Sequence, residues 1–184
     1  MKRFTTASFA LLLGTAALPA LAQDNPMVGG AEMFPDSTIV ENAANSADHT
    51  TLVAAVQAAG LAETLSGDGP FTVFAPTNEA FEALPEGTVD TLLMPENKQM
   101  LTDILLCHVV DAEVFSTDIA GMIEDDGGMH EVQTMGPCVL EAAMDGDALT
   151  LTDENGTVAT VTQADVDQSN GVIHVIDAVL TPAS

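Results

Sequence analysis

The chain has 184 residues, of which 28 are Asp or Glu and only three are Lys or Arg, for a formal net charge of -25. Nucleic-acid binding depends on clustered Lys and Arg side chains that neutralise phosphates, so this composition excludes that class of protein. Contact with an anionic membrane surface is disfavoured for the same reason. Hydrophobic residues make up 47% of the chain, well above the content of disordered proteins. The sequence therefore predicts an acidic globular protein of one domain.

The first 22 residues have the three parts of a secretory signal peptide. Lys2 and Arg3 give a positive start, a largely apolar run covers residues 9–18, and residues 20–22 (Ala-Leu-Ala) fit the small-x-small cleavage signal. The run is shorter than the roughly 18 apolar residues that span a membrane. We therefore expect cleavage after Ala22, no membrane span, and a location in the periplasm or outside the cell. Cleavage leaves 28 carboxylates against Lys98 alone, a net charge of -27.

Residues 23–36 contain two prolines and a Gly-Gly pair, which predict an irregular arm that leads into the domain. Ser37 is a candidate cap for a first helix over residues 38–45. Apolar residues at helical spacing over residues 52–59 predict a second helix, which ends at Gly60.

A strand follows at residues 71–74, where Phe-Thr-Val-Phe is rich in strand-forming residues, and Thr77 caps a short helix after it. Two more helices are expected at residues 88–94 and 95–107. After Val110 the helical spacing fades, and short runs between turns predict strands at 131–134, 138–143, 148–152, 157–162 and 172–176. Helices first and strands later indicate an α+β fold in a single domain.

Two cysteines, Cys107 and Cys138, lie in the part of the chain expected to be exported. In an oxidising compartment an even pair favours a disulfide. Two buried thiols are one alternative, and a reactive thiol beside His108 is another. The catalytic alternative is disfavoured because adjacent residues project in different directions from a strand or helix.

Acidic runs at residues 124–128, 145–147 and 153–156 resemble fragments of calcium loops, but none has the full ligand spacing. Turns with solvated acids are the simpler interpretation, and the charge alone predicts weak association with divalent cations. The four histidines lack metal-ligand spacing, and His174, inside an apolar run, is expected to bond a backbone group. There is no Gly-x-Ser-x-Gly motif and no phosphate loop. We therefore expect no enzyme activity, no metal site and no cofactor.

Two segments resemble the signature blocks of fasciclin domains. Residues 71–81 (Phe-Thr-Val-Phe-Ala-Pro-Thr-Asn-Glu-Ala-Phe) resemble the first block, and residues 170–180 (Asn-Gly-Val-Ile-His-Val-Ile-Asp-Ala-Val-Leu) resemble the second, in the family's order and at a similar separation. The resemblance implies a fasciclin domain at residues 37–182, after a signal peptide at 1–22 and an arm at 23–36. The whole chain is similar to bacterial secreted proteins built from a single such domain.

The resemblance implies an α+β fold, a fasciclin-like twisted β-sandwich or wedge flanked by helices. Within it we expect structural roles for three residues of the two blocks. Thr77 caps the helix after the first block, Asn170 opens the turn into the last strand, and His174 lies inside that strand.

The resemblance also implies adhesion or protein interaction, with an unknown cell-surface or matrix protein as the partner. In animal members, cell binding has been attributed to an Asp-Ile pair and a Tyr-His pair. Asp165-Val166 matches the first here, with Val for Ile, and Cys107-His108 matches the second, with Cys for Tyr. Asp165, Val166 and His108 are thus the candidate binding residues.

Two other functions remain open at this point. A few family members bind carotenoids, and the chain has nine methionines, whose flexible side chains fill cores or line adaptable grooves. The alternative function is therefore a carrier of a carotenoid- or lipid-like molecule in a Met-rich groove. A hydrolase with Cys107 as its nucleophile is the third hypothesis.

Overall fold

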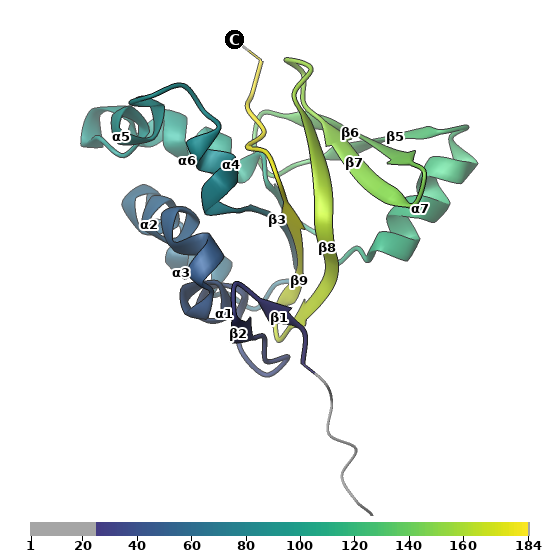
Figure 1. The fold of residues 1–184 in the computed structure, drawn as a ribbon, viewed down its shortest axis with the longest axis horizontal. Helices are drawn as coiled ribbons and strands as arrows, with labels where there is room; N and C mark the ends of the chain where they lie inside the picture. The colour runs from purple at the N-terminus through teal and green to yellow at the C-terminus, as the bar shows by residue number, and fades with distance from the viewer. Residues whose placement is uncertain (1–24, 184) are drawn as a thin grey trace, which may run out of the picture.

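The structure, a computed structural model, describes residues 25–183, so the expected signal peptide at residues 1–22 lies outside the described residues. Its centre is a seven-stranded sheet in the order β4-β3-β9-β8-β7-β6-β5, with helices packed against it (Figure 1). The strands are β3 (Phe71–Pro76), β4 (Val109–Val110), β5 (Met129–Gln133), β6 (Val139–Asp145), β7 (Ala148–Thr152), β8 (Val158–Gln168) and β9 (Gly171–Ile176).

Strands β3 and β9 are parallel neighbours, and every other pair in this sheet is antiparallel. Their register runs from Phe71 opposite Gly171 to Pro76 opposite Ile176, so the two segments that resemble fasciclin blocks lie side by side. Gly171 has φ 148°, and a Cβ atom there would collide with the Phe71 carbonyl, so the close approach of the two strands requires glycine.

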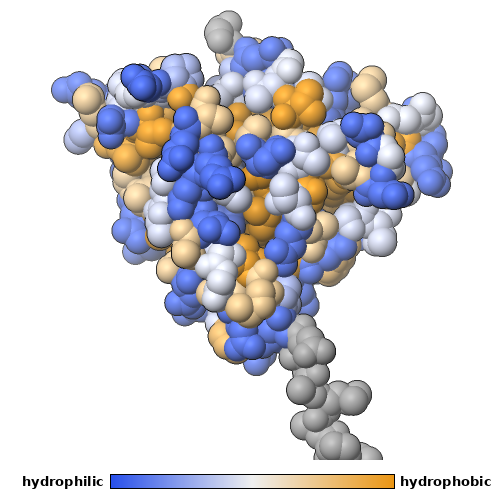
Figure 2. All heavy atoms as spheres, in the orientation of Figure 1, coloured by the Kyte–Doolittle hydropathy of each residue, from blue (hydrophilic) through white to orange (hydrophobic). Residues whose placement is uncertain are grey.

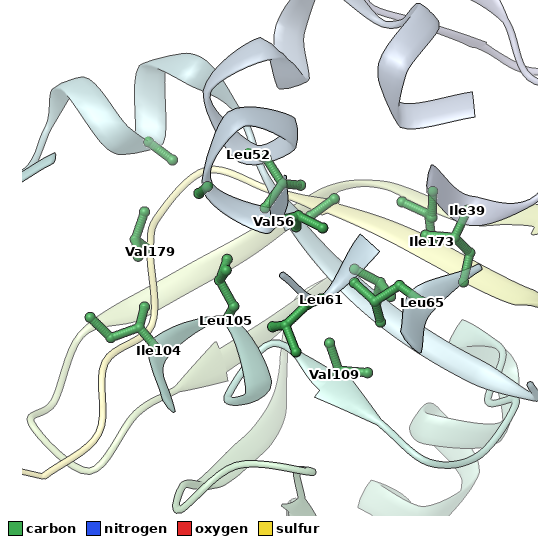
Figure 3. Packing of buried hydrophobic residues seen from close by; sticks show 14 of the residues in the cluster. Ile39, Leu52, Val56, Leu61, Leu65, Ile104, Leu105, Val109, Ile173 and Val179 are labelled. Atoms are coloured by element: carbon green, nitrogen blue, oxygen red, sulfur yellow. The ribbon is translucent and has the colours of Figure 1, made fainter. Parts of the chain in front are cut away.

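One face of β3 and β9 is covered by the helices that lie between residues 39 and 106 (Figure 1). Leu52, Val56, Leu105, Val109 and Ile173 all contribute to the core between these helices and the sheet (Figure 3). Each such side chain contributes about 1.5–3 kcal/mol through burial. The helices are α1 (Ile39–Asn45), α2 (Thr50–Ala59), α3 (Ala62–Leu65), α4 (Asn78–Glu82), α5 (Thr88–Leu92) and α6 (Lys98–Leu106), with short 3-10 turns η1 (Ala47–His49) and η2 (Pro95–Asn97).

A second core lies between the sheet and helix α7 (Ser116–Asp125). Because side chains alternate along a strand, Val73 and Ala75 of β3 point into the first core and Phe74 points into the second. Ile119 of α7 is buried in the second core beside Phe74. Strands β3 and β9 thus separate two cores.

Helix α7 corrects the expectation that no helix follows Val110, and the two-residue strand β4 was not expected either. Ile119, Met122 and Ile123 have helical spacing, but Gly121 and the polar residues around them weaken the pattern. The helix forms because its apolar side packs on β5 and β6.

The arm also differs from the irregular segment that was expected. Strands β1 (Met27–Val28) and β2 (Ala31–Glu32) pair as a short hairpin, with Val28 and Met33 buried against the first core. Thr38 caps α1 in place of Ser37, because its hydroxyl accepts from the Glu41 N–H while the Glu41 carboxylate accepts from the Thr38 N–H. Among residues 25–183, no helix is long and apolar enough to cross a membrane.

Candidate functional site

The loop between β4 and α7, residues 111–115, is held on the sheet by side chains from two central strands. The Thr72 hydroxyl on β3 donates to the Ala112 carbonyl at 2.6 Å and accepts from the Val114 N–H at 2.9 Å. His174 Nε2 on β9 lies 2.9 Å from the Val114 carbonyl oxygen. Since that oxygen only accepts, Nε2 carries the ring proton. The prediction that His174 bonds a backbone group is therefore confirmed.

Asp165 on β8 holds the start of α7. Its carboxylate accepts from the Ser116 N–H at 2.7 Å and from the Ser116 hydroxyl at 2.5 Å. Its own N–H donates to His174 Nδ1 at 3.3 Å. Asp165 has φ 58°, in the left-handed region that Asp and Asn tolerate better than other side chains. Asp165, Ser116 and His174 therefore form one connected group.

This group contains the residue types of a hydrolase triad, but its hydrogen bonds do not activate a nucleophile. The Ser116 hydroxyl donates to Asp165, while His174 donates to a backbone carbonyl and accepts from a backbone N–H. Burial lowers the pKa of His174 below its ordinary value and keeps the ring neutral at pH 7. Without a base on the hydroxyl, the arrangement positions a loop and a helix.

His108 and Val166 lie in the interior. His108 Nδ1 donates to the Ile104 carbonyl at 2.8 Å, and Nε2 accepts from the Leu180 N–H at 2.9 Å. Burial lowers the pKa of His108 to about 4, so a neutral ring joins α6 to the segment after β9. Val166 is 0% exposed. Of the three candidate binding residues, Asp165 alone lies at the surface.

Cys107 and Cys138 form the disulfide that was expected, with 5.2 Å between their Cα atoms. The bond joins the end of α6 to the residue before β6 and leaves no free cysteine among residues 25–183. A bonded sulfur is not a nucleophile, so the hypothesis of a hydrolase that uses Cys107 is wrong for this oxidised form.

Thr77 and Asn170 bond to helix ends. The Thr77 hydroxyl accepts from the Ala80 N–H at 3.3 Å, as a cap of α4. Asn170 Oδ1 accepts from the Ile39 N–H at 3.0 Å, at the start of α1. Its Nδ2 donates to the Leu65 carbonyl at 2.8 Å and to the Gly67 carbonyl at 2.9 Å, beyond the end of α3. The second block thus fixes two helices as well as a strand.

A buried amide network was not foreseen. Asn42 of α1 is 0% exposed; its side chain exchanges two hydrogen bonds with the Phe34 backbone and donates to Gln168 Oε1. The network ties the arm to α1 and to the end of β8. No sequence pattern marks it, because Asn and Gln are usually exposed.

Asp153, from one of the calcium-like acidic runs, is turned inward. Its carboxylate accepts from the N–H groups of Asn155, Thr157 and Thr181 at 2.8–2.9 Å. Burial alone raises the pKa of this carboxyl, but the hydrogen bonds from the Thr181 and Thr157 backbone outweigh it and hold the pKa below its ordinary value. In the part of the chain that the structure describes, no group of three His, Cys, Asp or Glu side chains suits a metal ion.

An apolar cavity of about 230 Å³, here named the slot, lies between β4 and β5, the two edge strands of the sheet. Its apolar lining comes from Phe74, Val110, Val114, Ile119, Met122 and Val132.

The slot is not the Met-rich groove that the composition suggested. The slot contains Met122 alone, and six other methionines are exposed on separate segments: Met27, Met94, Met100, Met129, Met135 and Met144. The correction has a simple cause, since composition counts methionines without indicating which surface they share.

The fold and these two blocks agree with comparisons to known proteins. A family model for the fasciclin domain matches residues 47–182. The chain belongs to the fasciclin domain family. The expected family resemblance is thereby confirmed.

Relatives of this fasciclin chain include both short and long proteins. Protein sll1483 of Synechocystis is 46% identical, over 95% of this chain and 91% of its own length. Immunogenic protein MPB70 of Mycobacterium bovis is 30% identical over 97% and 93%. Pig transforming growth factor-beta-induced protein ig-h3 is 38% identical over 80% of this chain, but the chain spans only 20% of that protein.

Among solved structures, a FAS1 domain pair from the insect cell adhesion molecule fasciclin I matches with a TM-score of 0.54. The match has 25% sequence identity and covers 71% of this chain and 43% of that one. It confirms the predicted fasciclin-like α+β fold.

Proposed function

We propose that this fasciclin protein is exported and acts as a non-enzymatic adhesion or interaction module for a cell-surface or matrix protein. The observation that carries the proposal is the way Asp165, Ser116 and His174 are bonded. The most triad-like group among residues 25–183 binds the backbone of its own chain, and the cysteines are bonded to each other. The surface around these internally bonded residues is then the part available for function, as in a binding module. The match to a domain pair of an insect cell adhesion molecule supports the same function.

Binding of the purified protein to native envelope and matrix fractions tests this proposal. Asp165→Asn removes the exposed charge at the position that matches the family's Asp-Ile pair, and Asn tolerates the backbone conformation there. We expect this change to weaken binding severalfold. The control is Asp167→Asn, which removes an exposed charge from the same strand. Equal effects of both changes would show that Asp165 is not part of the contact. No binding to either fraction would refute the adhesion proposal.

A carrier of a small apolar molecule is the second candidate, and the slot is the observation that favours it. A cavity of about 230 Å³ is smaller than the roughly 300–1,000 Å³ that encloses a drug-sized ligand, so it fits a short apolar molecule and not a whole carotenoid. Organic extraction of the protein purified from its native source, followed by mass spectrometry, tests this function. A stoichiometric apolar compound supports it, and an empty preparation contradicts it.

A further inference from the structure

Strand β5 presents a free backbone edge. Among the described residues it is the last strand of the sheet and pairs with β6 alone. Hydrogen bonds alternate along an antiparallel pair, so every second residue of β5 directs its N–H and C=O away from β6. Within residues 25–183, no backbone hydrogen bond from outside the β5–β6 pair reaches residues 129–133. These groups are available to another strand.

The slot runs along this edge. Four successive residues of β5, 130–133, line it. Since side chains alternate between the two faces of a strand, a cavity that touches four in a row lies along the strand's edge. Val110 of the other edge strand, β4, lies on the opposite side, and the Met135 N–H donates to the Val109 carbonyl at 2.7 Å beyond one end. The slot is therefore the gap in a sheet that nearly closes into a barrel.

The interior of the slot suits the apolar side of an added strand. Phe74 and Ile119 at its base are each 1% exposed, and Met122 and Val132 are half-buried beside them. A strand laid along β5 would direct alternate side chains toward the half-buried Met122 and Val132, and the others outward.

The charges around the slot select against a second copy of this chain. The lining and its flanks carry exposed acids at Asp111, Glu113 and Glu131. Lys98, the one Lys or Arg of residues 25–183, lies on α6 beside Gly60, at the end of α2. Two such edges repel each other, whereas a basic strand is attracted.

We propose that the slot binds an extended basic peptide segment of a partner protein, which pairs with β5 and places alternate apolar side chains against Met122 and Val132. The inference rests on the proposed interaction function and names the class of partner. It differs from the small-molecule candidate in using the backbone of β5 as well as the apolar interior.

The first test uses a fluorescein-labelled Lys-Val-Lys-Val-Lys-Val-Lys peptide and the full chain, with fluorescence anisotropy at physiological ionic strength. The matched probe carries N-methyl groups on alternate residues, which keeps the charge and removes the N–H groups that pair with a strand. We expect N-methylation to weaken binding by about tenfold, and amide exchange at residues 129–133 to slow only with the unmethylated peptide. Equal binding of both peptides, or unchanged exchange at β5, would overturn the proposal.

The second test reverses one charge at the slot. Glu131 lies opposite Glu141 in the β5–β6 register. Glu131→Lys therefore replaces a like-charge pair with an opposite-charge pair, and we expect the variant to fold. We expect Glu131→Lys to weaken peptide binding severalfold, and Glu63→Lys on α3, an equal change of charge, to leave it unaltered. Equal effects of the two changes would refute the proposal. So would failure of the unmethylated peptide to displace an apolar dye that is bound in the slot.

Competition between the peptide and the envelope or matrix fractions distinguishes the peptide site from the proposed interaction function. If envelope or matrix binding persists undiminished in the presence of excess peptide, the slot is not the contact and the interaction function stands. If the peptide binds β5 while neither fraction binds, the interaction function fails and the slot stands as a peptide site.

Discussion

At the scale of single residues, the side chain of Asp165 has a stabilising role that its exposure conceals. Asp165→Ala removes the acceptor of both Ser116 hydrogen bonds and places Ala at a φ of 58°. We expect a loss of about 1–3 kcal/mol in the free energy of unfolding, measured with urea. Asp165→Asn should cost less, because Asn keeps one acceptor and tolerates this backbone conformation. If Asp167→Ala destabilises the protein as much as Asp165→Ala, the capping role is wrong.

Buried histidines make stability depend on pH. Burial lowers the pKa values of His49, His108 and His174, that of His108 to about 4. Between that pH and 6.5 the unfolded chain binds protons that the folded chain does not. The contribution of His108 to the free energy of unfolding is therefore complete above pH 6.5 and falls as the pH drops toward 4, by up to about 1.4 kcal/mol per pH unit. His49 and His174 change the stability in the same direction, because their pKa values are lowered too.

Urea unfolding of the wild type and of His108→Gln at several pH values checks this dependence. The variant should lose less stability between pH 6.5 and pH 4.5, because one buried imidazole is gone. Parallel curves for the two proteins would show that His108 does not contribute to the pH dependence.

The residue-scale site was only partly predictable from sequence. His174 lies in an apolar run, which marks it as buried and bonded to backbone. The sequence does not indicate that Thr72 and Asn42 are buried, because a Thr in a strand or an Asn in a helix can face either water or a backbone carbonyl. Their partners, Val114 and Phe34, are identified only by the folded chain.

At the scale of elements, the disulfide joins the end of α6 to the start of β6 within the second core. It ties Cys107, after α6, to Cys138, before β6, across a sequence separation of 31. On the chain-entropy account, such a loop closure contributes about 3–4 kcal/mol. Thermal and urea unfolding with and without reductant should show a loss of that order in the wild type. A Cys107→Ala/Cys138→Ala variant should be indifferent to reductant, and a wild type equally stable in both conditions would contradict the prediction.

Elements with a strong local signal were predictable and those made by packing were not. Strand β7 has the predicted bounds, since it lies between two clear turns. Helix α7 was missed because its apolar stripe is short and interrupted by Gly121, and packing on β5 and β6 stabilises it. The arm hairpin was missed because strands of two residues carry no periodicity.

At the scale of the whole molecule, charge dominates the surface. Hydrophilic side chains are spread over the face in Figure 2, and apolar residues show between them at its middle and at its upper left. Cleavage of the expected signal peptide leaves 28 carboxylates and Lys98, so two copies repel each other.

Salt or Ca²⁺ screens this repulsion, and we expect any self-association to strengthen as either is added. Light scattering across a salt series, with a Ca²⁺ series at constant ionic strength, measures the effect. Association that weakens with added salt would show that ion pairs, and not apolar contacts, hold the copies together.

The parallel pairing of β3 with β9 also determines when the central sheet can be completed during folding. The partner of Phe71 is Gly171, so the centre of the sheet stays open until β9 is in place. A contact that spans so much of the chain forms slowly, since the intervening loop must close first. A chain that has not yet placed β9 has no complete sheet, because β3 and β8 both lack their central partner. The pairing that separates the two cores thus leaves both of them incomplete until late in folding.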